Sequence, residues 1–289
     1  MQPFDYYQAQ SIEEASRLLI QYNGKAKIVA GATDLLIRIE RGFLAPAVLI
    51  DVKKIPGFRE IASGGSGGLR IGAAATMNQV VVDPLVVERY PLLADACRSV
   101  ASYQLRNRAT MGGNLCNGSP AADSAPALIC YGASIELFGP AGTREMPLEA
   151  FFLGPGATAL QAGELLTAIL LPPPPTGAVG CWHKLGRTTV GDISVMNVAV
   201  LGWPDGDANS GASWRITLGS VAPTPLRATE AENLLARDSS SEGVAAAARA
   251  AAEASKPIDD IRASAVYRRD MVRVLTRRSV EKILNVTMS

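Results

Sequence analysis

The stretch Arg108-Ala109-Thr110-Met111-Gly112-Gly113-Asn114-Leu115 decides the fold when it is set beside an earlier one, Val29-Ala30-Gly31-Ala32-Thr33-Asp34. Both contain turns of small residues. Glycine and alanine let a backbone approach a ligand closely, and successive N–H groups in such a turn form a concavity that binds anions. A helix that follows adds its positive N-terminal end. Because a hydrogen bond to a charged group contributes about 1.5–3 kcal/mol, a few such N–H groups would hold a pyrophosphate without any Lys or Arg.

These turns do not match the common nucleotide fingerprints. No G-x-G-x-x-G follows the first strand, and G-x-x-x-x-G-K-[ST] does not occur in the chain. A Rossmann dinucleotide domain and a P-loop ATPase are therefore both disfavoured. Taken alone, each turn is most simply an ordinary tight connection. The two together, with the residues described below, favour a ligand that carries a diphosphate.

Predicted helices and strands alternate over the first 55 residues, and the rest of the chain combines them without regular alternation. Ser11-Ile12-Glu13-Glu14 is a capping box that opens a helix. Strands at 26–30 and 47–52, with a helix at 35–41 between them, predict a small α/β unit over the first 55 residues. Further strands are predicted at 69–75, 134–138, 164–171, 181–185, 195–203 and 214–221, and helices at 91–102, from Ser119-Pro120 onward, and at 228–236, 242–254 and 263–284, with a polar loop at 103–108.

The clearest linker is Pro172-Pro173-Pro174-Pro175-Thr176-Gly177. It divides the chain into a first domain at 1–175, with subdomains at about 1–55 and 56–175, and a smaller C-terminal domain at 176–289. The C-terminal domain is predicted to combine antiparallel strands with helices. The fold class is thus α+β.

Composition excludes several classes of protein. Of the 289 residues, 48% are apolar and 19% charged, which indicates a folded core rather than disorder. The 28 Lys and Arg nearly balance the 27 Asp and Glu, so a nucleic-acid partner is not expected. The N-terminus has no signal-peptide pattern, and the apolar stretch at 165–171 is too short for a membrane span. We expect a cytoplasmic protein.

A metal site is not expected in this chain. The four cysteines, Cys97, Cys116, Cys130 and Cys181, are widely spaced and are most simply buried structural thiols. The single histidine, His183, argues against a zinc or haem site. We interpret His183 as structural, because a general base needs a partner that the sequence does not identify.

An ordered set of motifs resembles the FAD-binding medium subunit of the xanthine dehydrogenase and carbon monoxide dehydrogenase family, which are molybdenum hydroxylases. The resemblance spans nearly the whole chain. It implies the two-subdomain flavin fold shared with vanillyl-alcohol oxidase and UDP-N-acetylenolpyruvoylglucosamine reductase, followed by a smaller α+β domain. The stretches that carry it are Ala30 to Leu36, Ile71 to Thr76, Arg108 to Leu115, Ser119-Pro120 with Asp123 and Pro126, Lys184 to Arg187, Asp192 to Ser194, Tyr267 to Arg269, and Val274-Leu275.

The resemblance implies a role for each matching residue. The residues implied to bind FAD are Val29, Ala30, Gly31, Ala32, Thr33 and Asp34 around the pyrophosphate, Thr110, Gly112, Gly113 and Asn114 on its other side toward the ribityl chain, Thr76 in the flavin channel, Asp123 on the adenosine ribose, Leu166 by the adenine, Lys184 at the isoalloxazine carbonyl edge, and Asp192 with Ile193 beside the reactive face. A carboxylate accepts strongly from a diol. A cation at the ring edge would raise the flavin potential.

Other interpretations of these residues stay open. Asp123 could cap a helix or pair with a base, Lys184 could be a solvated strand residue, and Leu166 belongs to the core in either case. Ala32 replaces a glycine common in the family, which is tolerable at negative φ and costly at positive φ. The last helix carries basic residues, which we interpret as a charged outer face, while a docking surface for an acidic partner stays open. They are Arg268, Arg269, Arg273, Arg277, Arg278 and Lys282.

The expected function is electron relay. By resemblance, a large partner subunit oxidises substrate at a molybdopterin cofactor, a small partner with 2Fe–2S clusters passes electrons on, and FAD on this chain hands them to an external acceptor. The expected assembly is a heterotrimer, single or doubled. No 4Fe–4S insertion is present. The alternatives are a self-sufficient FAD-dependent oxidoreductase of the same fold and a scaffold that has lost its flavin. Carbon monoxide, an N-heterocycle, an aldehyde and an aromatic thioester stay open as substrates, and oxygen, NAD and a quinone as acceptors.

Overall fold

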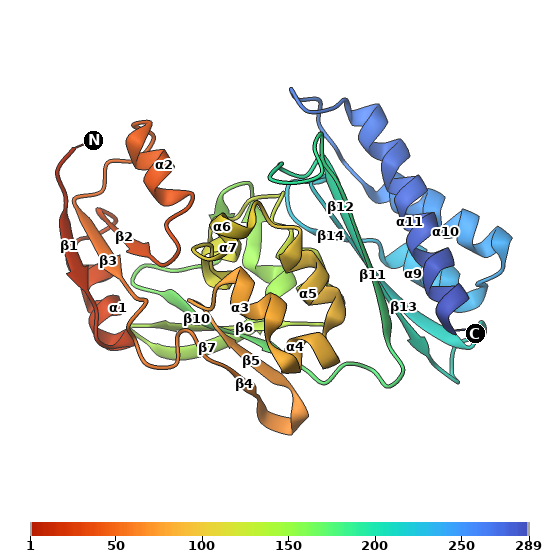
Figure 1. Cartoon of the computed structure of the whole chain (residues 1–289), viewed down its shortest axis with the longest axis horizontal. Coiled ribbons are helices and arrows are strands. Elements are labelled where there is room, and N and C mark those ends of the chain that lie inside the picture. The colour runs from red at the N-terminus through yellow and green to blue at the C-terminus, as the bar shows by residue number, and fades with distance from the viewer. Residues whose placement is uncertain (1, 288–289) are drawn as a thin grey trace.

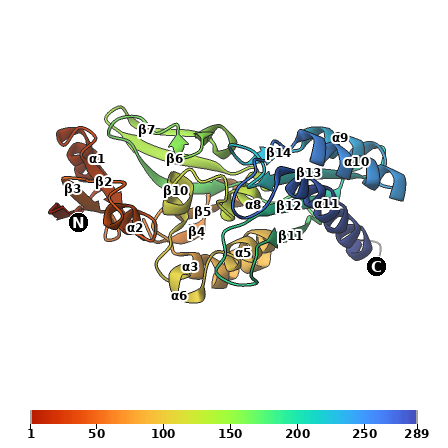
Figure 2. The ribbon, with the colours of Figure 1, turned by 90° about the horizontal axis from the view of Figure 1, so that it is seen from above.

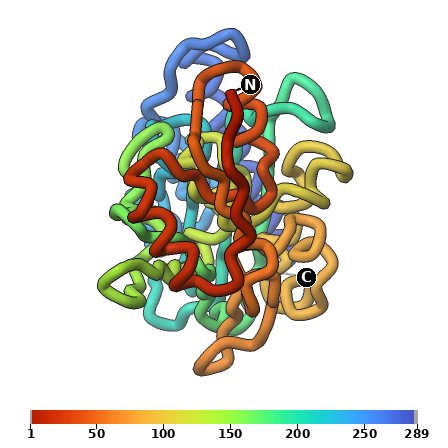
Figure 3. The backbone as a smooth tube through the Cα atoms, turned by 90° about the vertical axis from the view of Figure 1, so that its left-hand side faces the viewer, coloured from red at the N-terminus to blue at the C-terminus, as the bar shows by residue number. Residues whose placement is uncertain are grey.

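The structure, a computed structural model, describes residues 2–287. Three groups of elements follow one another along the long axis of the molecule, in the order of the chain (Figure 1). The view from above shows the same row, with the first helices and strands at one end and the last three helices at the other (Figure 2). Figure 3 looks along the row, with the first group in front of the other two.

The first group is a three-stranded parallel sheet with order β1-β3-β2. Its elements are β1 (Asp5–Gln8), α1 (Ile12–Gln21), β2 (Ala26–Val29), α2 (Leu35–Glu40) and β3 (Val48–Asp51). Ser11 caps α1 by accepting a hydrogen bond from the Glu14 amide, as the capping-box pattern predicts. Buried Ala15, Leu18 and Ile50 form its core. The first small-residue turn leaves the carboxyl end of β2, the edge where parallel sheets commonly bind ligands.

The middle group is built on a five-stranded sheet with order β4-β5-β10-β6-β7, antiparallel throughout. Its strands are β4 (Ile61–Ser63), β5 (Leu69–Gly72), β6 (Ser134–Gly139), β7 (Gly142–Pro147) and β10 (Leu165–Leu171), with a separate pair β8 (Phe152–Gly154) and β9 (Ala157–Thr158). Its helices are α3 (Met77–Val82), α4 (Pro84–Arg89), α5 (Pro91–Arg98), α6 (Tyr103–Arg106), α7 (Met111–Cys116) and α8 (Ser124–Cys130), with short 3-10 turns at Gly65–Gly67 and Leu148–Phe151. The continuous apolar run of β10 is explained by its central position, buried on both faces.

The C-terminal group is a four-stranded antiparallel sheet in chain order. Its elements are β11 (Val179–Leu185), β12 (Met196–Pro204), β13 (Ala212–Gly219), β14 (Leu226–Arg227), α9 (Thr229–Arg237), α10 (Ser241–Ala254) and α11 (Ala265–Thr287). The three helices cover one face of this sheet (Figure 1). Helices α5 and α8 of the middle group pack on the other face. Gly180 lets β11 come this close, because a Cβ there would lie 2.7 Å from the Cβ of Leu92.

Several predicted element boundaries are wrong. The segment at 103–108, predicted as a loop, contains α6, and the helix predicted from Ser119-Pro120 begins only at Ser124, after a turn. The strand predicted at 69–75 ends at Gly72, because the next carbonyls accept hydrogen bonds from the second small-residue turn. None of the described helices combines the length and apolar character needed to cross a membrane.

Candidate functional site

The first loop, residues 29–34, exposes a row of unused backbone donors. Within the described part of the chain, the N–H groups of Gly31, Ala32, Thr33 and Asp34 donate no hydrogen bond. Ala32 has φ +63°, in the left-handed region. A left-handed residue in such a run makes the successive N–H groups converge, which is the geometry of an anion-binding nest. The loop is therefore built to receive an anion.

The second loop, residues 108–114, lies directly against the first. A Cβ on Gly31 would stand 2.2 Å from the carbonyl oxygen of Arg108 and 3.0 Å from the Cα of Ala109. Only glycine permits this contact, because the neighbouring atoms are backbone and cannot rotate away. The two small-residue turns, distant in sequence, thus lie in direct contact.

The backbone of the second loop is used differently from that of the first. The Met111 amide donates to the Ala75 carbonyl at 2.9 Å, and the Gly112 amide to the Ala73 carbonyl at 2.8 Å. The Gly113 amide donates to the Thr110 hydroxyl, which caps α7. Most amides of the loop are therefore already bonded within the protein, so this wall offers a surface rather than a row of donors.

The two glycines of the second loop have different tasks. A Cβ on Gly112 would lie 2.8 Å from the Cβ and from the carbonyl oxygen of Ala73, so this glycine is required for packing. Gly113 is exposed, and a Cβ there would meet only the Thr110 hydroxyl within 4 Å. Because that contact would be only 2.8 Å, a side chain at 113 would disturb the hydroxyl that caps α7, and a ligand lying over this exposed surface would be a second reason for glycine.

Asp123 and Lys184 form a buried ion pair. The Lys184 ammonium donates to the Asp123 carboxylate at 2.7 Å and to the Ser99 carbonyl at 2.9 Å. The other carboxylate oxygen accepts from the Ser194 hydroxyl at 2.5 Å and from the Asn197 amide at 2.9 Å. Burial raises the pKa of the Asp123 carboxyl, and the Lys184 ammonium and the two polar donors oppose that rise. The pair joins the middle group of elements to β11 and β12.

The predicted roles of Asp123 and Lys184 cannot both hold. The adenosine ribose and the isoalloxazine edge lie at opposite ends of an FAD molecule, so side chains 2.7 Å apart cannot serve both. The alternative that Asp123 pairs with a base is what the structure shows. The alternative that Lys184 is a solvated strand residue is wrong, since its side chain is 14% exposed. Because an ammonium has three donors and two are used, Lys184 keeps one for a ligand.

The remaining predicted residues are distributed around this centre. Thr76 caps α3 and pairs with Thr110 as an antiparallel bridge, which places it beside the second loop. Asn114 accepts a hydrogen bond from the Ser124 hydroxyl at 2.7 Å. Leu166 is buried in the core of β10. The Asp192 carboxylate accepts from the Arg187 and Ile193 amides, so it holds the 186–193 loop in shape, and these bonds keep its pKa low.

Three partners of the ion pair were not predicted as site residues: Ser99, Ser194 and Asn197. Asn197 did carry a signal, because it is the one polar side chain in the otherwise apolar start of β12, and a buried amide in such a strand needs a partner. Ser99 contributes only its carbonyl, which no side-chain pattern reveals.

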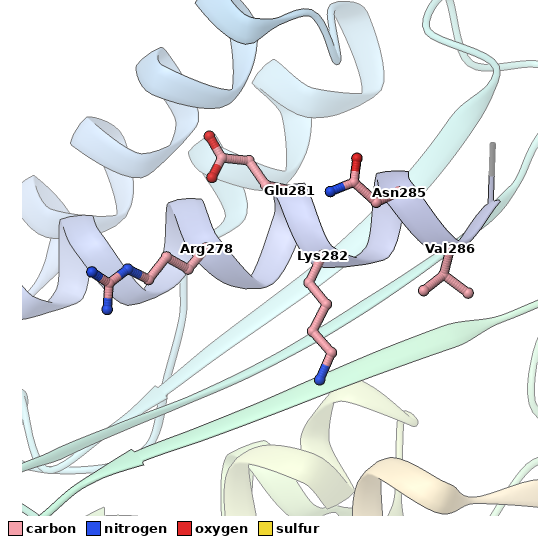
Figure 4. A pocket seen from close by; sticks show the side chains of 5 residues that line it. All are labelled: Arg278, Glu281, Lys282, Asn285 and Val286. Atoms are coloured by element: carbon pink, nitrogen blue, oxygen red, sulfur yellow. The ribbon is translucent and has the colours of Figure 1, made fainter. Parts of the chain in front are cut away.

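A cavity of about 570 Å³ lies away from these loops, along the last turns of α11. Figure 4 shows its lining residues, with Lys282 pointing toward the strands beneath the helix. Burial, together with the charges of Lys282 and Arg278, lowers the pKa of His183 of β11, whose imidazole contacts the Ser279 hydroxyl at 2.9 Å. None of the predicted cofactor residues lines this cavity.

Comparison with known proteins agrees with this geometry. Residues 2–174 match the family model described as FAD binding domain in molybdopterin dehydrogenase, and residues 181–283 match the CO dehydrogenase flavoprotein C-terminal domain. The carbon monoxide dehydrogenase medium chain of Hydrogenophaga pseudoflava is 36% identical over 96% of each chain. The xanthine dehydrogenase FAD-binding subunit of Escherichia coli O157:H7 is 33% identical over 96% of this chain and 94% of that one.

Solved structures give the same result. A carbon monoxide dehydrogenase structure from Hydrogenophaga pseudoflava superposes with a TM-score of 0.92 at 37% identity, covering 97% of this chain and 98% of the other. Fold and loops together define the class: an FAD-binding flavoprotein with a C-terminal α+β domain. Within that class, this chain belongs to the family of FAD-binding medium subunits of molybdenum hydroxylases, which are oxidoreductases.

Proposed function

We propose that this chain is the flavin-carrying electron relay of a larger molybdenum hydroxylase. A small partner subunit with 2Fe–2S clusters would deliver electrons from a large molybdopterin subunit, and this chain would pass them to an external acceptor. The similar medium chains of carbon monoxide dehydrogenase support this assembly. The expected form is a heterotrimer in the cytoplasm. Bound FAD supplies the redox chemistry, because a flavin accepts electrons singly and releases them singly or in pairs.

The observation that carries the proposal is the row of four unpartnered N–H groups at Gly31 to Asp34, walled by the second loop. Each such donor contributes about 1.5–3 kcal/mol to an anion that it bonds. Four such donors are enough to hold a diphosphate by hydrogen bonds without a Lys or Arg. The exposed surface at Gly113 gives the same ligand room on the opposite wall.

Other residues would position the flavin end of the cofactor. The third ammonium proton of Lys184 is free to bond a ring carbonyl or a ribityl hydroxyl. Asp123 keeps that ammonium in place and supplies its counter-charge. Ile193, 59% exposed on the loop that Asp192 shapes, offers an apolar surface to one face of the ring. No proton transfer is assigned to His183, which bonds Ser279 of α11.

The test is the flavin content of the purified full chain and of two variants. Gly113→Val should abolish the flavin absorption, because a branched side chain would occupy the space of the diphosphate. Gly206→Val is the matched control: this glycine is exposed, has no neighbour within 4 Å, and lies far along the chain, so the variant should stay yellow. Thermal melting of both variants separates loss of flavin from loss of fold.

Two results would contradict the proposal. Full flavin content in a folded Gly113→Val chain would remove the second loop from the site. Bleaching of the purified flavoprotein by an organic substrate, with no partner subunit present, would indicate a self-sufficient oxidoreductase instead of a relay. Co-expression of this chain with iron–sulfur and molybdenum subunits encoded by neighbouring genes should yield one complex on size-exclusion chromatography.

A further inference from the structure

Strand β11 forms one edge of the C-terminal sheet, and its outer side has no strand beside it. Within the described chain it pairs only with β12, antiparallel over 179–185. In such a pair, alternate residues turn their N–H and C=O groups away from the neighbouring strand. Among the described residues, no hydrogen bond from outside the sheet reaches the backbone of 179–184. The outward groups of this stretch are therefore available to another strand.

The edge of β11 lacks the usual protection against strand pairing. Natural sheets shield their edges with short strands, proline or outward-pointing charges. With seven residues, β11 is the longest edge strand that the structure describes, and it contains no proline. Its one permanently charged side chain, Lys184, is turned inward and bonds Asp123. An edge of this kind is expected to be covered by another strand in the assembled protein.

Both faces of β11 are already occupied, so a partner can approach only in the plane of the sheet. On one face, Gly180 lies against α5, and the Trp182 indole donates to the Ser99 hydroxyl at 3.1 Å. On the other face, the His183 imidazole contacts a hydroxyl of α11 at 2.9 Å. Between these faces the strand is only half-buried, except at Cys181. A chain that adds to this edge must therefore be extended.

The flank of α11 beside this edge is basic. Arg278 and Lys282 are exposed there and line the cavity of about 570 Å³. Figure 4 shows Lys282 pointing toward the strands beneath the helix. Both cations lie near β11, because their charges add to burial in lowering the pKa of His183. A segment added to the edge would lie close to both of them.

The charges around this flank favour an acidic partner. Glu281 also lines the cavity, but it pairs with Arg277 at 2.7 Å. Asp95 of α5, the helix on the opposite face of β11, pairs within its own helix at 2.7 Å. Arg278 and Lys282 form no ion pair within residues 2–287. Because the side chains of a strand alternate between its faces, every second residue of an added strand would face these cations, and carboxylates fit there.

We propose that the edge of β11, with the flank of α11 beside it, binds an extended acidic segment of a partner subunit as an additional strand. Backbone hydrogen bonds hold the segment, and its carboxylates toward Arg278 and Lys282 select it. This inference deepens the relay function and rests on it for the identity of the partner as a subunit. None of the predicted cofactor residues lines the cavity on this flank, so the segment and the flavin use different sites.

A second copy of this chain fits the edge less well. Two β11 edges that pair antiparallel about a two-fold axis place both α11 helices on the same face of the joined sheet. Arg278 and Lys282 of one copy would then face the same residues of the other, and like charges destabilise such a contact. An acidic segment meets the same surface with opposite charge.

The test is binding of a labelled peptide to the purified full chain, followed by fluorescence anisotropy. The probe is as long as β11 and alternates valine with glutamate, so that an extended conformation places all its carboxylates on one face. Replacing every glutamate by lysine should weaken binding at least about tenfold.

Two further probes test the backbone pairing. One carries N-methyl groups on the glutamates and the other on the valines. Because only one of these sets of N–H groups faces β11, one probe should lose binding at least about tenfold and the other should keep it. The probe that fails also reveals whether the added strand runs parallel or antiparallel to β11.

A charge-matched pair of variants locates the surface. Lys282→Glu should weaken binding of the glutamate probe at least about fivefold and tighten binding of the lysine probe. Arg273→Glu makes the same change of charge on an exposed part of α11 outside the cavity, and should alter either affinity by less than about twofold.

Absent binding of the glutamate probe, equal binding of the glutamate and lysine probes, equal effects of the two N-methyl patterns, or equal effects of the two variants would overturn the proposal. So would a dimer of the full chain alone that the glutamate probe dissociates, because a second copy would then occupy the edge. Flavin content is read separately by absorption. A yellow chain that does not bind the probe removes only this inference, whereas a colourless chain that binds it contradicts the relay function alone.

Discussion

Ala32 has a φ of +63° where only glycine is free of steric cost. The sequence left open whether the Ala32 methyl is tolerated. The positive φ found in the structure is the conformation in which that methyl has a steric cost. The conformation is kept because the nest needs a left-handed residue between its donors. Here the requirements of the site prevail over local backbone preference.

Ala32→Gly should raise the free energy of unfolding by about 0.5–1 kcal/mol, because relief of the left-handed strain exceeds the extra backbone entropy of glycine. Flavin content should be unchanged. Urea denaturation of the two proteins measures the difference, and Ala30→Gly, in the same loop without a positive φ, serves as the control and should destabilise. A destabilised Ala32→Gly would show that the left-handed conformation is not populated in solution.

Lys184→Met should cost about 3–5 kcal/mol of stability, because it leaves the buried Asp123 carboxylate without its cation. The double variant Lys184→Met with Asp123→Asn should recover much of that loss, since no buried charge then remains. Denaturant midpoints of the single and double variants form a cycle that isolates the pair. Additive losses would mean that the two side chains do not interact.

His183 provides a pH test, because it is the only histidine in the sequence. Burial, with Lys282 and Arg278 nearby, lowers its pKa below the usual value of about 6.5. The unfolded chain therefore binds a proton more readily, and stability falls as pH drops below 6.5. An NMR titration of the imidazole should show a midpoint below 6.5. His183→Gln should remove this part of the pH dependence, and a normal midpoint in the wild type would contradict the burial argument.

At the scale of elements, the last helix departs from the face predicted for it. Arg268 was placed with the charged outer face of α11, but it is 2% exposed and bonds the Val195 and Ser220 carbonyls. Helical periodicity places Arg268 on the solvent-exposed face, but this holds only if no other segment covers the first turn of α11. Here the segment before α11 folds over that turn and brings Asp260 to the guanidinium at 2.6 Å.

Asp260→Asn should destabilise the protein by about 1.5–3 kcal/mol, because Arg268 loses the charge that it bonds inside the protein. Arg262 and Arg268 hold the pKa of the Asp260 carboxyl well below its usual range. The Asp260 carboxylate therefore stabilises the folded protein above about pH 4, and this stabilisation is lost as the pH falls further. Urea midpoints of the variant and the wild type should therefore begin to approach each other as the pH falls below about 4. Asp207→Asn, on an exposed turn, should differ little from wild type at any pH.

The sequence predicted the small-residue turns and most strands because these depend on local signals. Helix α3 was not predicted, although Thr76 and Gln79 form a capping box that marks its start. Strand β1 was not predicted either, because all four of its residues are exposed and show no apolar alternation. The Asp123 to Lys184 contact joins residues 61 positions apart, and no spacing rule encodes such a pairing.

At the scale of the whole molecule, the C-terminal sheet shares a core with the middle group. Ala199 and Leu201 of β12 belong to the same buried cluster as Leu92 and Leu128. Arg215 of β13 bonds the Cys130 carbonyl at 3.0 Å, and the Asp123 to Lys184 pair crosses the same boundary. If Asp123 and Lys184 belong to the flavin site as proposed, that site depends on both sides of this contact, although the Pro-rich linker suggests separable domains.

This shared core leads to a prediction about the linker itself. Residues 1–175 expressed alone should aggregate or bind little FAD, because Leu92 and Leu128 would lose their apolar cover and Asp123 its cation. By contrast, a chain carrying a protease site inserted between Pro174 and Pro175, cut after folding, should stay together on size exclusion and keep its flavin, because the apolar contact does not need the covalent link. The uncut chain with the same insertion is the control. Separation of the halves after cleavage, with flavin retained on the first, would show that the C-terminal group does not complete the site.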